Sequence, residues 1–75
     1  MSGFKLVDLS SGDEVAEYGT VQDALRDVSD VLVLGGERAV ASIRLEFEDA
    51  SGRTGVVAQG AGLVKLAVRT HFGQN

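Results

Sequence analysis

The chain has 75 residues, with ten glycines, one histidine and no cysteine, proline or tryptophan. Eleven acidic side chains against seven basic ones give a formal charge of −4. This length allows one small domain, and the lack of cysteine excludes disulfides and thiolate metal sites. The apolar share of 44% argues against disorder. No apolar run approaches the ~20 residues of a membrane span and no signal-like segment follows Met1, which favours a cytoplasmic protein.

So small a domain gains little net stability from burial alone. Disulfides are excluded and no metal site is indicated, so a partner subunit is the remaining common source of stability. We therefore expect one domain over residues 1–75 that forms a homo-oligomer, most simply a symmetric dimer. Residues 69–75 are expected to form a loose tail.

The first 18 residues predict a β-hairpin. Phe4–Leu9 has the composition of a strand, and Glu14–Tyr18 alternates well enough to return as a second strand. The segment Ser10–Asp13 between them has turn chemistry. Gly12 tolerates positive φ there, and the serine and aspartate side chains can bond to nearby backbone.

A helix follows this hairpin. Gly19 ends the strand, and Thr20 with Asp23 approximates a capping box. Apolar residues then recur at the spacing of one helical face, at Val21, Ala24, Leu25, Val28, Val31 and Leu32. The opposite face is polar and carries Gln22, Asp23, Arg26, Asp27, Ser29 and Asp30. Gly35 and Gly36 predict the end of the helix.

Strict alternation then predicts a third strand over Ala39–Glu48. Its buried face would carry Ala41, Ile43, Leu45 and Phe47, and its wet face Ser42, Arg44, Glu46 and Glu48. Asp49–Arg53 predicts a second turn and Thr54–Ala58 a fourth strand, where Gly55 indicates a bulge or a close backbone approach.

Residues 63–72 fit a helix or a strand. Apolar residues recur at helical spacing in this segment, but they also alternate. A short helix is favoured because Leu63, Lys65 and Ala67 are good helix formers.

The predicted fold is α+β: a four-stranded, mostly antiparallel sheet in ββαββ(α) order, with helices packed on one face. The expected core contact sets one apolar helix face against the third strand. It joins Leu25, Val28 and Leu32 to Ile43, Leu45 and Phe47. A hairpin followed by a helix appears at Phe4–Leu34 and again at Ala39–Thr70, which a true repeat and a chance recurrence of common turn residues both explain.

The charge is unevenly distributed along the chain. Residues 1–37 carry eight acids and two bases, a balance of −6, whereas residues 38–75 carry three acids and five bases, a balance of +2. The acidic helix face of Asp23, Asp27 and Asp30 is either a solvated surface or a contact surface for a basic partner. In a further interpretation, the two halves meet head to tail in an oligomer. The net negative charge argues against direct nucleic-acid binding.

No residue pattern predicts catalysis. His71, the only imidazole, lies four residues from the C-terminus, where no rigid shell would orient it. No serine lies in a G-x-S-x-G motif. The stretch Val31–Ser42 (VLVLGGERAVAS) lacks the spaced glycines of a dinucleotide-binding loop, so a helix end followed by a strand accounts for it better.

The carboxylates gather beside the two turns and lack the spacing of a calcium loop. These residues are Asp8, Asp13, Glu14, Glu46, Glu48 and Asp49. Turn formation and solvated strand edges explain both groups. We therefore expect no catalytic, cofactor-binding or metal-binding residues and no enzymatic activity.

Residues 19–27 (GTVQDALRD), directly after the hairpin, resemble the T-x-x-E-A-L helix entry of HicB-type antitoxins. The resemblance covers residues 4–28 and implies a small antiparallel sheet and helix that bind a small, basic toxin ribonuclease. The family's Leu-Pro-Gly-Cys stretch is absent, because the chain has neither proline nor cysteine. The whole chain also resembles short bacterial proteins made of a hairpin, a helix and a second hairpin, which implies no particular activity.

From these patterns we expect a non-enzymatic interaction or regulatory module that self-associates. The alternative is an acidic inhibitor or antitoxin-like protein. It would bind a basic partner through Asp23, Asp27 and Asp30.

Overall fold

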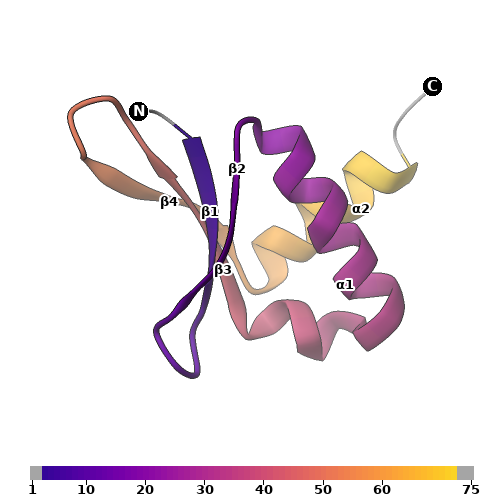
Figure 1. Cartoon of the computed structure of the whole chain (residues 1–75). Coiled ribbons are helices and arrows are strands. Elements are labelled where there is room, and N and C mark those ends of the chain that lie inside the picture. The colour runs from indigo at the N-terminus through magenta and orange to yellow at the C-terminus, as the bar shows by residue number, and fades with distance from the viewer. Residues whose placement is uncertain (1–2, 73–75) are drawn as a thin grey trace.

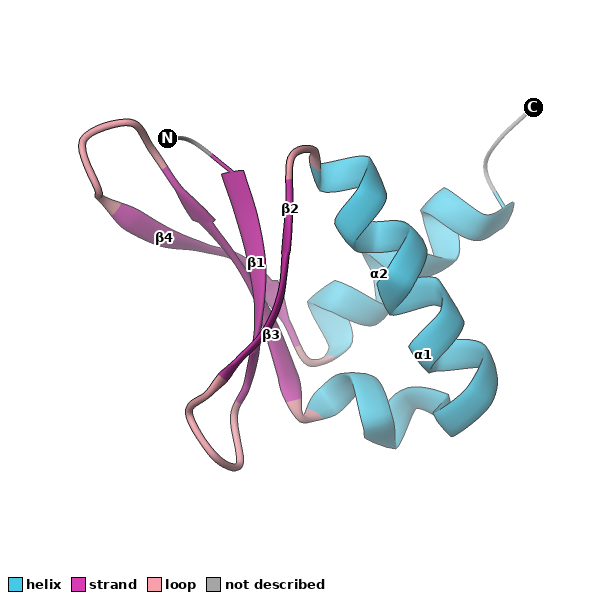
Figure 2. Ribbon diagram, in the orientation of Figure 1, coloured by secondary structure: helices cyan, strands magenta, loops and turns pink. Residues whose placement is uncertain are grey.

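A computed structural model describes residues 3–72 of the chain, with side chains up to residue 70. Hairpins and helices alternate along it as β1 (Gly3–Asp8), β2 (Glu14–Tyr18), α1 (Val21–Ala41), β3 (Ile43–Glu48), β4 (Thr54–Gln59) and α2 (Ala61–Phe72). The strands form one antiparallel sheet in the order β2-β1-β3-β4. Both helices lie on the same side of this sheet (Figures 1 and 2). The predicted α+β fold is confirmed.

The central pair of strands, β1 and β3, joins two units of the form strand, strand, helix. In this pair Phe4 lies opposite Phe47, and Leu6 lies opposite Leu45. The second strand of each hairpin is therefore an outer strand of the sheet. The recurrence of hairpin and helix is present in the shape of the chain, although the second unit begins at Ile43 and not at Ala39.

The two hairpin turns use the same hydrogen bonds. Asp8 Oδ1 accepts from the amide (2.9 Å) and the hydroxyl (2.7 Å) of Ser10, and Asp49 Oδ1 accepts from the amide (3.0 Å) and the hydroxyl (2.7 Å) of Ser51. These hydrogen bonds hold the pKa of both carboxyl groups below the ordinary value. Both turns form where the residue types predict them.

Helix α1 begins as predicted but does not end at the glycine pair. The hydroxyl oxygen of Thr20 caps the helix by accepting from the amide of Asp23 at 3.1 Å. At Gly36 the chain takes φ 75° and ψ −174°, which bends the helix, and helical backbone then resumes to Ala41. The prediction of a strand over residues 39–42 is wrong. The extra turn buries Val40 completely and returns the chain to the sheet.

The bend gives two adjacent glycines different physical roles. A Cβ at Gly35 would lie 2.7 Å from the Cβ of Ala39, whereas Gly36 needs a left-handed φ that side chains disfavour. We predict that Gly36→Ala lowers the free energy of unfolding by about 1–3 kcal/mol, because φ 75° with ψ −174° is a combination that essentially only glycine adopts. Chemical denaturation monitored by circular dichroism measures this loss.

The matched control is Gly62→Ala, in α2. Gly62 has no positive φ, and a Cβ added there would have no neighbouring atom within 4 Å. Alanine there should raise the free energy of unfolding by about 0.4–1 kcal/mol, because it reduces the entropy of the unfolded chain. Equal effects of the two substitutions would contradict the assigned role of the bend.

The ambiguous C-terminal segment is a helix. Leu63 and Ala67, one turn apart, are both fully buried, so helical spacing and not strand alternation describes the contact. The helix runs to Phe72, and residues 69–72 are therefore helical and not the loose tail expected from the sequence. The remainder of that predicted tail, residues 73–75, lies outside the described residues.

A buried serine links the two helices. Ser29 Oγ lies 2.9 Å from the carbonyl oxygen of Leu25, within α1, and 3.0 Å from that of Ala67, in α2. Its hydroxyl can donate to either carbonyl. The sequence pattern placed Ser29 on the polar face of α1, and this was wrong because α2 covers the position. The hydroxyl is tolerated there because its hydrogen bond is satisfied.

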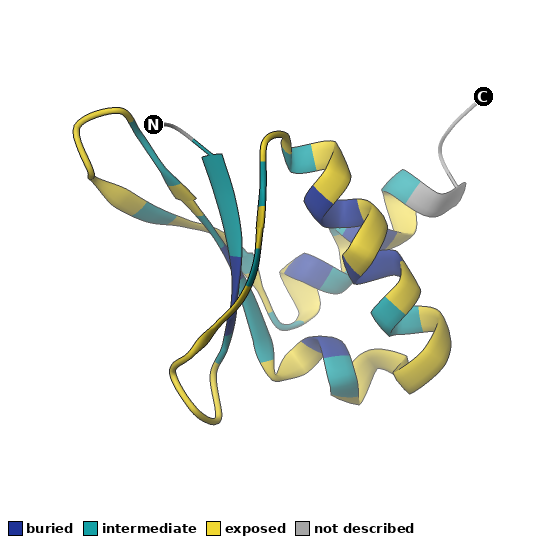
Figure 3. Ribbon diagram, viewed as in Figure 1, coloured by how far each residue is buried: buried dark blue, intermediate teal, exposed yellow. Residues whose placement is uncertain are grey.

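The core lies between the sheet and the two helices (Figure 3). Its buried members are Leu6, Ala24, Leu25, Val28, Val40, Leu45, Leu63 and Ala67. The predicted contact of α1 with β3 is present, with Leu32 and Ile43 partly buried at its margin. The exception is Phe47, which is 40% exposed because the β3–β4 hairpin extends past the helices (Figure 1).

Gly55 and the predicted bulge lie close together on β4. The pairing of β3 with β4 shifts between Leu45 and Glu46, which places the extra residue at Val57. Gly55 instead accommodates the ring of Phe47, since a Cβ there would lie 2.5 Å from that ring. The bulge and the close approach that Gly55 indicated are thus both found on β4, the bulge at Val57 and the close approach at Gly55 itself.

Leu45 is fully buried at the centre of the sheet. We predict that Leu45→Ala lowers the free energy of unfolding by about 2–5 kcal/mol, because it leaves a cavity that the packed neighbours cannot fill. Val33→Ala, at a position that is 69% exposed, is the control and should change little. Similar effects of both substitutions in denaturant titrations would refute the assigned core.

Candidate interaction surfaces

The three predicted partner-binding aspartates lie on one exposed face of α1. Asp23 forms a 3.9 Å ion pair with Arg26, and both side chains are exposed, so the pair contributes little to stability. Asp27 accepts a hydrogen bond from the hydroxyl of Tyr18 at 2.8 Å. Asp30 is exposed one turn further along. The structure therefore brings the three carboxylates together, with one of them also tying α1 to β2.

The contact between Tyr18 and Asp27 changes the ionisation of the tyrosine. Burial first, and then the hydrogen bond and negative charge of Asp27, raise the pKa of Tyr18 to about 12. The neutral phenol is the form that the fold favours. Its contribution to stability is complete below the unfolded pKa near 10 and is lost as the pH rises towards 12.

Tyr18 is the only tyrosine and the chain has no tryptophan, so its titration can be followed directly by ultraviolet absorbance. We predict a midpoint near pH 12 in the native protein. Asp27→Asn should lower that midpoint, while Asp30→Asn, on the same helix face, should leave it unchanged. A midpoint at the ordinary value of about 10 in the native protein would contradict this contact.

The side of the sheet away from the helices carries charged residues in cross-strand pairs. Lys5 on β1 lies opposite Glu17 on β2 and Glu46 on β3. Arg44 Nε and Nη2 each lie 2.6 Å from Glu46 Oε2. The Glu46 side chain forms this ion pair and is only 12% exposed, so the prediction that it lies at a solvated strand edge is wrong.

Two glutamates on the outer strand β2 repel one another. A side-chain hydrogen bond with Glu17 is the largest cause of the raised pKa of Glu14, followed by desolvation and then by the negative charge of Glu17. Both glutamates are exposed on β2. The β2 side of the sheet is therefore acidic even before the aspartates of α1 are considered.

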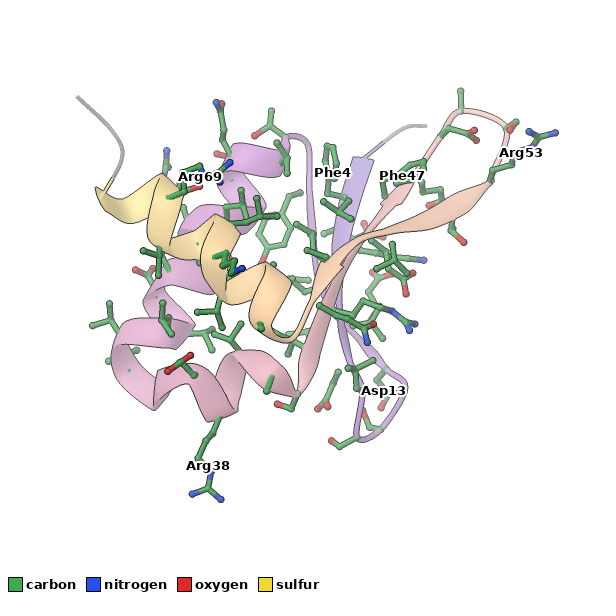
Figure 4. The ribbon with its side chains drawn as sticks, turned by 180° about the vertical axis from the view of Figure 1, so that it is seen from behind. Phe4, Asp13, Arg38, Phe47, Arg53 and Arg69 are labelled. Atoms are coloured by element: carbon green, nitrogen blue, oxygen red, sulfur yellow. The ribbon has the colours of Figure 1, made fainter. Side chains whose placement is uncertain are left out.

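An apolar pocket of about 230 Å³ lies where the β3–β4 hairpin leaves the helices. It is lined by Gly3, Phe4, Gly19, Phe47, Glu48 and Asp49. Figure 4 shows Phe4 and Phe47 on neighbouring strands at this end of the sheet. Sequence reasoning missed the pocket because it assigned Phe47 to the covered core.

The other sequence candidates are the carboxylates, the glycine pair of α1 and His71. Among residues 3–70, no group of histidine, cysteine, aspartate and glutamate side chains could hold a metal ion. The stretch around Gly35 and Gly36 is a bent helix, which provides no glycine-rich phosphate loop. It exposes Val33 and Leu34, the latter 87% exposed. The side chain of His71 lies outside the described residues.

The outer strand β4 differs from β2 in charge. The segment Thr54–Gln59 has no ionisable side chain, and Val56 within it is 55% exposed. Arg53 lies in the turn before it, and Lys65 and Arg69 are exposed on α2, which packs on β4. Figure 4, seen from behind, brings β4 and α2 forward and shows Arg53 and Arg69.

No helix among the described residues is both long enough and apolar enough to cross a membrane. In comparisons with known proteins, no family model, curated protein or solved structure matches this chain.

Proposed function

We propose that this protein is a non-enzymatic interaction module that self-associates. The observation that supports this most directly is that β4 is an outer strand, which pairs with β3 on one side only. Soluble proteins usually protect an outer strand with charge, proline, a bulge or a covering segment, and of these β4 itself has a bulge at Val57. Between Thr54 and Gln59 the chain has no charge and no proline, and Val56 and Val57 are exposed.

The size of the chain supports the same proposal. A domain of 75 residues without disulfides has a small core, and a second copy is a common source of added stability at this size. The extension of the β3–β4 hairpin past the helices leaves β4 accessible to another chain (Figure 2).

The second candidate function is that of an acidic inhibitor or antitoxin-like protein. It is supported by the shared exposure of Asp23, Asp27 and Asp30 on one face of α1. Such a protein would bind a basic partner as a monomer, and Asp→Asn changes at the three positions would abolish capture of that partner.

Sedimentation velocity from low to high micromolar concentration tests the proposal. We expect the average mass to rise with concentration, and Val57→Glu to weaken association by about tenfold or more, since it places charge on the outer strand. Val33→Glu, with the same change in charge on α1, is the control and should leave association unchanged. A wild-type monomer at every concentration would contradict self-association.

A further inference from the structure

The fold converts the charge polarity of the sequence into two sides of opposite charge. α1 packs on β1, β2 and β3, whereas α2 packs on β4. The side formed by β2 and α1 exposes Glu14, Glu17, Asp23, Asp27 and Asp30. The side formed by β4 and α2 exposes Arg53, Lys65 and Arg69, and residues 50–75 contain no aspartate or glutamate. Figure 1 shows β2 and α1 nearest the viewer, with α2 behind them.

Both outer strands can accept a further strand in the same geometry. The sheet is antiparallel throughout in the order β2-β1-β3-β4, so its outer strands run in opposite directions. A second copy shifted along the sheet would therefore place its β2 antiparallel to β4 of the first copy. All helices would remain on one face of the extended sheet.

Resting on the self-association proposed above, we infer that copies of this chain join head to tail. The β4–α2 side of one copy binds the β2–α1 side of the next. Lys65 and Arg69 on α2 then lie on the same face of the extended sheet as the exposed aspartates of the neighbour's α1, Asp23, Asp27 and Asp30, which provides charge complementarity. A symmetric contact through β4 would bring Lys65 and Arg69 of one copy near the same two cations of the other copy. A symmetric contact through β2 would bring the glutamates of the two copies together.

Bulges limit how much strand pairing the contact can contain. The pairing of β1 with β2 shifts between Leu6 and Val7, which places an extra residue at Val15, and β4 has its extra residue at Val57. Only short stretches of each outer strand are regular, so the charges must supply much of the specificity. Association should therefore weaken steeply as salt screens these charges. Because a head-to-tail contact leaves a free side at each end, the assemblies lengthen with concentration.

A charge-swap experiment tests this inference. One variant, Lys65→Glu with Arg69→Glu, makes the β4–α2 side acidic. The other, Asp23→Lys with Asp30→Lys, makes the exposed α1 face of the β2–α1 side basic, because Asp27 is then the one acid beside Arg26 and the two new lysines. Each is examined by sedimentation velocity alone and in an equimolar mixture at low salt, after circular dichroism shows that it is folded.

We expect each variant alone to be monomeric, because like charges then meet at every contact, and the mixture to associate in a 1:1 ratio. The single variants Arg69→Glu and Arg38→Glu change the net charge equally. Only the first should weaken association, by about tenfold or more. Arg38 is a suitable control because it projects from the far end of α1 (Figure 4).

Two results would overturn the head-to-tail contact while leaving self-association intact. One is association of the Asp23→Lys, Asp30→Lys variant alone, which a symmetric β4 contact predicts. The other is a mixture that stays monomeric although the wild type associates. A wild type that never associates would overturn the proposed function and this contact together.

Discussion

The pairing of β1 with β3 is the constraint on which the rest of the structure depends. It sets Leu6 beside Leu45 beneath the helices and joins the two hairpin–helix units through their first strands. As a consequence β2 and β4 become the outer strands, α1 covers the β2 side, and α2 packs on β4. A charge difference between the two halves of the sequence thereby becomes a charge difference between two sides of the molecule.

The bend in α1 satisfies a second requirement of this arrangement. The chain must return from the far end of a helix to the central strand β3, and the turn after Gly36 makes that return while burying Val40. The same helix is tied to β2 by the hydrogen bond from Tyr18 to Asp27 and contacts α2 around Ser29. The helices thus lie on one face only, and the opposite face of the sheet carries ion pairs such as that of Arg44 with Glu46.

Local signals predicted most of the fold. The turn residues, the Thr20 cap and the alternation in β3 act within a few residues of one another, so they can be interpreted without tertiary information. The failures arise where distant segments decide the outcome. Ser29 is buried because α2 covers it. Helical backbone resumes after Gly36 because the chain must return to the sheet. Phe47 is exposed because the β3–β4 hairpin extends past the helices. For the candidate site, the sequence predicted the acidic face of α1 and the charge polarity. The sequence could not show that the acidic and the basic residues lie beside opposite outer strands, because the strand order depends on pairing between distant segments.

Site-specific cross-linking tests the head-to-tail contact most directly, because the chain contains no cysteine of its own. Val15→Cys and Val57→Cys place one thiol on each outer strand, at exposed positions. After oxidation of an equimolar mixture at low salt, we expect the dominant covalent dimer to join the thiol at position 15 to the thiol at position 57, as identified by mass spectrometry. Dimers formed equally well by the Val57→Cys variant alone would contradict a contact between unlike sides.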